Sequence, residues 1–213
     1  MKLTLLGDEK ISSVRATLES LTASLGSQGV EIVTDHESCK GGAFLFALSY
    51  AKIVPEDTRR LYDWCFVLHG SSLPFGRGWS PITWQILSGE RNFTMSLIHM
   101  SDPVDSGDIV AQREFEVGED LLFEEISSVI GQVQSELIES CLGMTPSQLL
   151  GVRQDGTKSY YGKRSPSDSE IDPSKPLSDQ WNSLRAADPV RYPSFFTLGG
   201  RKYVLRIERL EEN

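Results

Sequence analysis

Two short segments of this sequence hold the residue types needed for proton transfer at a polarised carbonyl. His69 ends the apolar run WCFVLH, and Asp105 and Asp108 lie in the turn-like stretch SDPVDSGDI at residues 101–109. An imidazole can donate to a developing oxyanion and relay protons near neutral pH, and a carboxylate beside it fixes its tautomer. We therefore predict His69 as the oxyanion and proton group, with Asp108 orienting it and accepting a proton.

Each of these residues also has a purely structural interpretation. A lone histidine at a strand end is more often a satisfied polar residue than a catalyst. Asp and Gly dominate turns, so both aspartates could simply cap one, and this alternative is stronger for Asp105 than for Asp108. The combination of His69, Asp108 and the motif between them favours catalysis.

The segments before His69 alternate between short apolar runs and a helical period. Apolar residues three or four apart predict an amphipathic helix over 10–25, and Pro55-Glu56-Asp57 begins another helical stretch. The continuous apolar run from Ala43 to Leu48 is typical of a central parallel strand. Strands are predicted at 2–6, 30–33, 43–48 and 64–68.

This alternation predicts a Rossmann-like α/β fold: an open, mostly parallel sheet with helices on both faces. Ligands of such sheets bind outside the carboxyl ends of the strands, which is where His69 lies. Ser80 is a candidate N-cap and Pro81 a first helical residue for a helix over 80–88. Further elements are predicted as an alternating segment at 93–100, a long helix at 119–142 and a strand at 201–208.

The composition limits the classes of partner and compartment. The chain has 213 residues and a net charge of −9, which disfavours a large nucleic-acid partner. Three widely spaced cysteines indicate a reducing compartment without disulfides, and no metal-ligand pattern is present. No apolar segment is long enough to span a membrane, and no signal peptide is seen, so a cytoplasmic protein is predicted. Residues 1–150 are interpreted as a core and 151–213 as a C-terminal extension lining its cleft.

The two polar segments also occur in a recognisable order. His69 is followed by Ser72-Leu73-Pro74, Arg77-Gly78, Pro81, Trp84 and Gly89-Glu90, and then by Asp105-Ser106-Gly107-Asp108. This order over about forty residues resembles the formyltransferase family that uses 10-formyltetrahydrofolate. The resemblance implies 10-formyltetrahydrofolate as cosubstrate and no metal.

The resemblance also implies where the folate binds. The segment LSYAKIV at residues 48–54 looks like the family's strand-end segment whose backbone receives the pterin ring. The predicted cofactor-binding residues are therefore Ser49, Tyr50, Ala51, Ile53, Ser101, Asp102, Val104 and Asp105.

The part of the chain after residue 150 resembles a narrower branch, the sugar-nucleotide N-formyltransferases. The matching positions are Arg164, Pro166, Asp168, Asn182, Arg185-Ala186, Pro193 and Phe195-Phe196. An aromatic and basic group in an acidic protein also suits a nucleotide diphosphate, although a solvated charged tail explains it about equally well. Arg77 could contact a phosphate or brace its own loop. The predicted substrate-binding residues are Ser71, Ser72, Arg77, Gly78, Tyr160, Lys163, Arg164, Arg185 and Tyr192.

One position departs from the family pattern. The family's Asn, two residues before the His, falls on Val67 here, and that Asn is taken to share the oxyanion with the His. Removing one oxyanion donor by mutation typically costs about 3–4 kcal/mol. A backbone N–H near Gly70, the hydroxyl of Ser71 or Ser72, or an ordered water are the candidate replacements.

Together these resemblances imply N-formylation of a nucleotide-linked amino sugar for surface glycans, with a UDP-linked pseudaminic acid precursor as one candidate. Two alternatives stay open. One is formylation of another amine, such as that of aminoacyl-tRNA. The other is a relative that lost activity with the Asn and only binds folate or a nucleotide. A homodimer through the C-terminal extension or a core edge is a further possibility.

Overall fold

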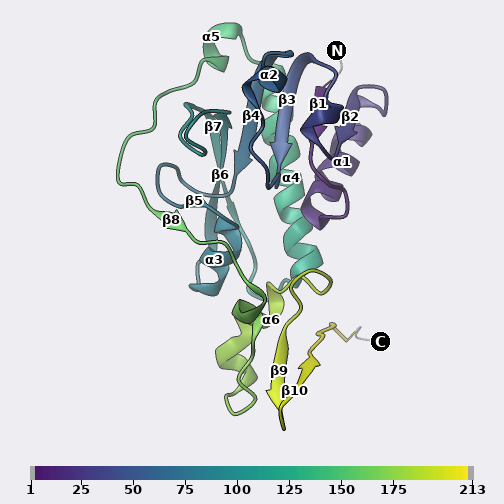
Figure 1. Cartoon of the computed structure of the whole chain (residues 1–213), viewed down its shortest axis with the longest axis vertical. Helices are drawn as coiled ribbons and strands as arrows, with labels where there is room; N and C mark the ends of the chain where they lie inside the picture. Colours follow the sequence, from purple (N-terminus) through teal and green to yellow (C-terminus); the bar gives the residue numbers. More distant parts are fainter. Residues whose placement is uncertain (1–2, 211–213) are drawn as a thin grey trace.

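The centre of the computed structural model, which describes residues 3–210, is a six-stranded sheet of order β2-β1-β3-β4-β6-β7 (Figure 1). The first four strands of this order are parallel, and β3 lies between β1 and β4 as its apolar sequence predicts. Their bounds are β1 Leu3–Leu6, β2 Val30–Val33, β3 Gly42–Leu48 and β4 Tyr62–His69.

The other two strands turn the sheet antiparallel at one edge. β6 (Asn92–His99) pairs antiparallel with β4 and places Ser96 opposite His69, and β7 (Ile109–Glu116) pairs antiparallel with β6. The register shifts between Leu97 and Ile98, where the two strands approach the loop that contains the predicted aspartates. The sequence analysis did not identify β7, because charged residues interrupt its alternation.

One face of the sheet carries two long helices, α1 (Ser12–Leu25) and α4 (Phe123–Leu142). Their apolar stripes and the sheet enclose the main core, which includes Val14, Phe46 and Leu137. The helices pack closely: a Cβ at Gly131 would lie 2.5 Å from the Cβ of Ala16. Both helices were predicted, although α4 begins four residues later than the sequence pattern indicates.

The opposite face has a shorter helical cover. A smaller core there includes Leu45, Val54 and Tyr62, next to two one-turn segments, η1 (His36–Ser38) and α2 (Glu56–Arg59). The predicted α/β fold with a mostly parallel sheet flanked by helices is therefore confirmed.

The loop after His69 leads into α3 (Pro81–Leu87). Pro81 is at the start of the helix as predicted. Ser80 occupies the N-cap position. Its backbone is left-handed (φ 47°), and its side chain makes no capping hydrogen bond. Ser80 is therefore the N-cap residue as predicted, but its side chain does not cap the helix.

The chain after α4 runs back along the molecule before it forms a small terminal lobe (Figure 1). On the way, the two-residue strand β8 (Tyr160–Tyr161) pairs with β5 (Arg77–Gly78) in the loop that follows His69. The predicted strand at 201–208 is seen only as β10, paired antiparallel with β9 in a hairpin. The remaining elements are α5 Pro146–Leu149, η2 Pro166–Ser169, η3 Leu177–Gln180, α6 Trp181–Arg185, β9 Phe195–Leu198 and β10 Arg201–Val204.

Two further predictions concern the state of the cysteines and the presence of a membrane-spanning helix. Cys39, Cys65 and Cys141 are free thiols, and burial raises the pKa of Cys65 and of Cys141 to about 12. These two thiols stay protonated and serve packing, as the apolar run around Cys65 indicates. Within residues 3–210, no helix combines the length and the apolar character that a membrane span needs.

Candidate active site

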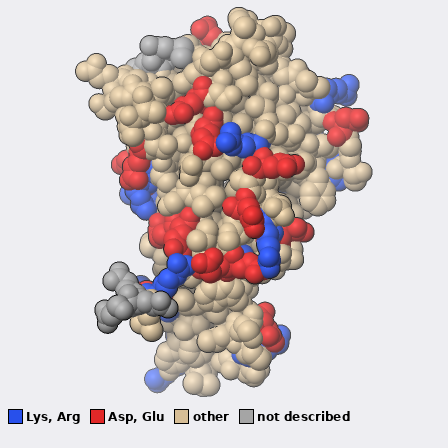
Figure 2. Space-filling view, turned by 180° about the vertical axis from the view of Figure 1, so that it is seen from behind, with Lys and Arg blue, Asp and Glu red and all other residues tan. Residues whose placement is uncertain are grey.

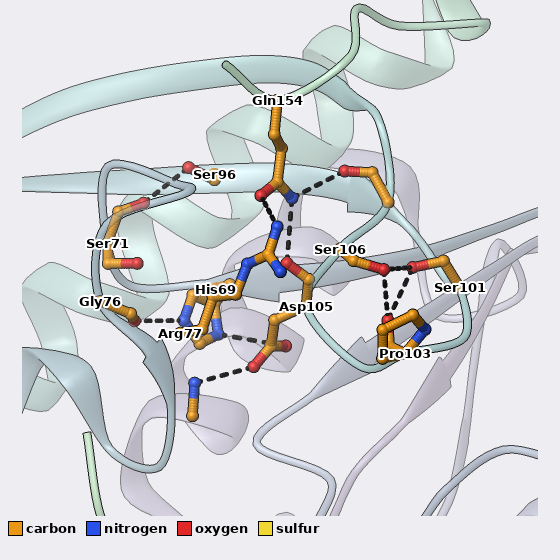
Figure 3. A network of polar contacts seen from close by, with 12 residues as sticks. His69, Ser71, Gly76, Arg77, Ser96, Ser101, Pro103, Asp105, Ser106 and Gln154 are labelled. Atoms are coloured by element: carbon orange, nitrogen blue, oxygen red, sulfur yellow. Dashed lines mark hydrogen bonds and ion pairs between the residues drawn. The ribbon is translucent and has the colours of Figure 1, made fainter. Parts of the chain in front are cut away.

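His69 lies at the carboxyl end of β4, where its ring is held between two acceptor oxygens (Figure 3). The residue is 7% exposed. Its Nε2 is 2.8 Å from the carbonyl oxygen of Gly76, and its Nδ1 is 3.6 Å from Oδ1 of Asp105. The second distance is an ion-pair contact and exceeds a hydrogen bond. Both oxygens face an N–H only when both ring nitrogens carry a proton.

Asp105 completes this arrangement from the loop after β6. Its Oδ2 accepts a hydrogen bond of 2.9 Å from the backbone N–H of Gly78, and its side chain is 9% exposed. The backbone of Asp105 is left-handed (φ 59°), a conformation that Asp tolerates better than most residues and that is common at functional sites.

The structure therefore corrects the predicted partner of His69. Asp108 is exposed, and its carbonyl oxygen accepts a 3.0 Å hydrogen bond from the N–H of His99. Gly107 packs against the same strand end, because a Cβ there would lie 1.9 Å from the oxygen of His99. Asp108 is thus already part of the strand pairing, and the carboxylate beside the catalytic candidate is that of Asp105.

The segment around β8 holds the loop that supplies both partners of this pair. The N–H of Gly76 donates to the hydroxyl of Ser159 at 2.7 Å, and the N–H of Arg77 donates to the carbonyl of the same residue at 3.0 Å. The N–H of Trp79 donates to the carbonyl of Tyr161 at 3.1 Å. A segment 83 residues downstream therefore positions the Gly76 carbonyl and the Gly78 N–H.

A cavity of about 830 Å³ opens beside His69 at the carboxyl ends of the strands. Two loops border it: residues 49–54 after β3 and residues 100–105 after β6. Ser49, like Asp105, has a left-handed backbone (φ 49°). All eight residues predicted to bind the folate line the cavity, and their role stays a prediction: Ser49, Tyr50, Ala51, Ile53, Ser101, Asp102, Val104 and Asp105.

Another part of the cavity wall comes from the chain after residue 150. Four of the predicted substrate-binding residues belong to this wall: Tyr160, Lys163, Arg164 and Tyr192. A fifth, Gly78, lines the cavity from β5. The ammonium of Lys163 lies 4.8 Å from the centre of the Trp79 ring. The Nε of Arg164 is buried without a hydrogen-bond partner, and burial lowers the pKa of this guanidinium. The Nη2 of Arg164 donates to the Asp168 carbonyl and to the Ser169 hydroxyl, both at 3.3 Å. Because these acceptors are neutral, the charges of both cations remain uncompensated by an ion pair and can attract an anionic ligand.

Comparison with known proteins agrees with this geometry. Residues 40–142 match the Formyl transferase family model. Methionyl-tRNA formyltransferase from Clostridium thermocellum superimposes with a TM-score of 0.81 at 20% identity, covering 99% of this chain and 94% of that one. The resemblance to formyltransferases is confirmed.

Two further solved structures share this formyltransferase fold. A sugar N-formyltransferase from a Shewanella species has a TM-score of 0.68 at 16% identity, with 100% of this chain and 99% of that chain covered. HypX from Aquifex aeolicus in complex with tetrahydrofolic acid has a TM-score of 0.72 at 18% identity. The match covers 97% of this chain but only 37% of HypX, so the likeness concerns one part of that protein.

Arg77 is predicted as a substrate ligand, but its buried side chain instead holds two loops of the site together. Its side chain is 4% exposed and does not line the cavity. Its Nη2 donates to Oε1 of Gln154 at 2.5 Å, and Nε2 of Gln154 donates to the carbonyls of Asp105 and Gly107. Arg77 thereby connects its own loop to the aspartate loop, which is the loop-bracing alternative.

Three other predicted substrate residues also lie away from the cavity. Arg185 is 2% exposed, and its guanidinium donates to Asn182 Oδ1 at 2.8 Å and to the Gly118 carbonyl at 2.9 Å. Ser71 is buried and Ser72 is exposed, and neither lines the cavity. Arg185 is consumed by packing the terminal lobe onto the core, so its predicted contact with substrate is wrong on geometric grounds.

Several cavity residues were not found from the sequence. Trp79 lines the cavity and is 41% exposed. Gln134 and Ser127 lie inside a helix whose pattern gives no sign of a ligand site. Asp188 lines the cavity as well, yet its carboxylate accepts bonds from the N–H groups of Val190 and Arg191. The run Arg-Ala-Ala-Asp-Pro-Val-Arg was the signal that could have identified this turn.

Asp35, His36 and Glu37 form a group whose ligand atoms lie within 4.8 Å of one another, close enough to share a metal ion. Two of the three side chains are already engaged: His36 Nδ1 is 2.7 Å from the hydroxyl of Tyr50, and Asp35 pairs with Lys52. Because Tyr50 and Lys52 belong to the loop at 49–54, this group supports the cavity border.

Proposed function

We propose that this protein transfers the formyl group of 10-formyltetrahydrofolate to the amine of a nucleotide-linked amino sugar. The observation that carries the proposal is the pair of His69 and Asp105 at the wall of a large cavity. The loops predicted to bind folate, residues 49–54 and 100–105, border that cavity on one side. Lys163 and Arg164 lie on another side. An acidic chain thereby offers a local binding place for phosphate.

The proposed reaction uses the pair directly. The neutral sugar nitrogen forms a bond to the formyl carbon, the bond between that carbon and the folate nitrogen breaks, and the amine proton ends on the folate nitrogen. His69, once protonated on both nitrogens, places a positive charge beside the developing oxyanion, and Asp105 stabilises that cation at 3.6 Å. Holding amine and formyl carbon together in the cavity supplies a further large part of the rate.

The oxyanion needs a second donor because Val67, a cavity residue, replaces the family's Asn. Among the predicted replacements, Gly70 also lines the cavity, whereas Ser71 and Ser72 do not. The Gly70 backbone or a water beside it is therefore the favoured second donor.

The two loops suit a folate. Ile53 and Val104, one from each loop, are 67% and 55% exposed and line the cavity. Large apolar side chains at a cavity mouth lose this exposure when a flat ring lies between them. The fold shared with a tetrahydrofolate complex of HypX supports the same ligand.

The C-terminal wall suits a nucleotide diphosphate. Lys163 and Arg164 have no carboxylate within ion-pair distance in the part of the chain that the structure describes. The rings of Tyr160 and Trp79 are exposed beside them. Cations for phosphate oxygens and rings for a base form the set that such a ligand requires. The full-length fold match with a sugar N-formyltransferase from Shewanella supports this choice.

An aminoacyl-tRNA acceptor is the second candidate, favoured by the methionyl-tRNA formyltransferase likeness. Figure 2 shows many Asp and Glu side chains, interspersed with Lys and Arg, across the rear face of the molecule, and the net charge is −9. A long phosphate backbone gains little from such a surface. We therefore prefer the sugar acceptor, with a UDP-linked pseudaminic acid precursor in surface glycan synthesis as the first one to test and a cytoplasmic homodimer as the working state.

The deciding experiment is a product assay. Purified protein, 10-formyltetrahydrofolate and UDP- and dTDP-linked amino hexoses are mixed, and the mass of each sugar is followed. We expect one acceptor to gain a formyl group, and Lys163→Gln to raise its KM more than Lys158→Gln, an exposed lysine away from the cavity. Formylation of methionyl-tRNA alone would move the function to the second candidate, and folate binding without any turnover would indicate an inactive relative.

A further inference from the structure

The cavity extends past His69 into a space between α1, α4 and the sheet. Phe123, Ser127, Ile130 and Gln134 line it from α4, at spacings of four, three and four that place them on one face of the helix. Ile11 and Ser13 line it near the start of α1, and Met95 lines it from β6. This inner part is walled by apolar side chains with a few uncharged polar groups.

Gln134 presents a half-satisfied amide to this space. The residue is 3% exposed and lines the cavity. The Thr17 hydroxyl is 2.7 Å from its amide oxygen and 2.8 Å from the carbonyl of Ser13. Within residues 3–210, the side chain of Gln134 has no other hydrogen-bond partner. One end of the amide is thus fixed by Thr17, and the other end is free for a ligand.

The hydroxyl of Thr17 has a single proton, which limits the arrangements. If that proton goes to the Ser13 carbonyl, the Gln134 amide bonds Thr17 through its N–H, and its oxygen faces the cavity. If the proton goes to Gln134, the amide N–H faces the cavity. A ligand hydroxyl, which both donates and accepts, satisfies either arrangement.

Charge separates this space from the rest of the cavity. The residues that line this space at α1, α4 and β6 include Ile11, Met95 and Ile130. None of the lining residues from these elements is a Lys, Arg, Asp or Glu. The phosphate-type cations Lys163 and Arg164 come from the C-terminal wall. A phosphate is therefore disfavoured in the inner space, and a neutral ring with hydroxyl groups fits it.

We propose that Gln134, oriented by Thr17, is a specificity-determining residue that hydrogen-bonds a ring hydroxyl of the acceptor sugar; the inference rests on the proposed function. An apolar acyl side chain would leave the buried amide unpaired. The same contact thus selects sugars over aminoacyl acceptors.

The test compares Gln134→Leu with Gln132→Leu, an identical change on an exposed position of the same helix. The probes are the tightest-binding UDP- or dTDP-linked amino hexose and analogues with one ring hydroxyl replaced by hydrogen. We expect Gln134→Leu to raise the KM for the sugar roughly tenfold, with the folate KM unchanged, and Thr17→Val to act in the same direction. Gln132→Leu should change neither.

Calorimetric binding of the same sugars separates this inference from the reaction itself. Wild-type protein should lose roughly tenfold in affinity for one deoxy analogue, and Gln134→Leu should bind that analogue and the parent sugar equally. The loss of affinity for the deoxy analogue is measured on wild-type protein alone, so it does not depend on whether a variant folds. Equal binding of all analogues by wild type would overturn the role of Gln134 while formyl transfer stands. Selective binding without formyl transfer would retain the inner site and overturn the reaction. Binding of no amino sugar would overturn both.

Discussion

Two histidine–aspartate couples join strand ends to the loop between β6 and β7, and they differ in which atoms make the contact. His69 and Asp105 face each other through their side chains, 3.6 Å apart and nearly buried. His99 and Asp108 meet through the backbone, at 3.0 Å from N–H to carbonyl. The ring of His99 packs 5.0 Å from that of Phe66 and contacts the Leu149 carbonyl at 2.8 Å. The same two residue types thus serve chemistry in one couple and architecture in the other.

The largest difference is expected when each aspartate is neutralised. Asp105→Asn removes the charge beside His69, so we expect kcat for formyl transfer to fall by about 10²–10⁴-fold. Asp108→Asn keeps the backbone bond to His99 and should leave kcat within roughly twofold of wild type. Single-turnover rates at saturating folate and acceptor measure both. An equal loss in the two variants would mean that the side-chain and backbone couples are not distinct.

Stability should respond next to a change at Gly107. An added Cβ would lie 1.9 Å from the His99 oxygen, so Gly107→Ala must push the aspartate loop off the strand end. We expect the free energy of unfolding to fall by about 1–3 kcal/mol, measured in urea. Gly162→Ala is the control, because nothing lies within 4 Å of its added Cβ. Unchanged stability in Gly107→Ala would show that the loop is not seated on β6.

Gln154 tests how the catalytic couple is held. Gln154→Leu removes the acceptor of the buried Arg77 and two donors to the aspartate loop. We expect a loss of about 1–2 kcal/mol in stability, together with a modest fall in kcat as Asp105 loses its fixed position. Thermal melts and turnover are measured on the same preparation. Lost stability with unchanged kcat would limit the brace to folding.

The smallest effect is expected at the architectural histidine. His99→Gln loses ring packing and the contact with the Leu149 carbonyl, for about 0.5–1.5 kcal/mol of stability. The pH dependence of kcat should match wild type, because the ring of His99 takes no part in the proton path. A shifted pH profile would give this cavity-lining histidine a chemical role and remove the contrast between the two couples.

Periodicity predicted the elements whose burial is regular. The apolar runs of β3 and β4 and the spacing of Val14 and Leu21 in α1 left few alternatives, because each face packs against one layer. The periodicity did not predict β7, because this strand lies at the edge of the sheet and has charged residues at its exposed positions. The missing capping bond of Ser80 could not be predicted, because capping depends on the backbone angle of one residue, which a local pattern does not report.

The residue types, their order along the chain and the position of His69 at a strand end were determined by the sequence itself, because burial periodicity and motif spacing are local properties. Only the tertiary structure decided that Asp105 and not Asp108 meets His69. It also decided that Arg77 and Arg185 are buried braces while Lys163 and Arg164 face the cavity. The direction of a charged side chain depends on backbone angles and on partners such as Gln154 and Ser159, which lie tens of residues away.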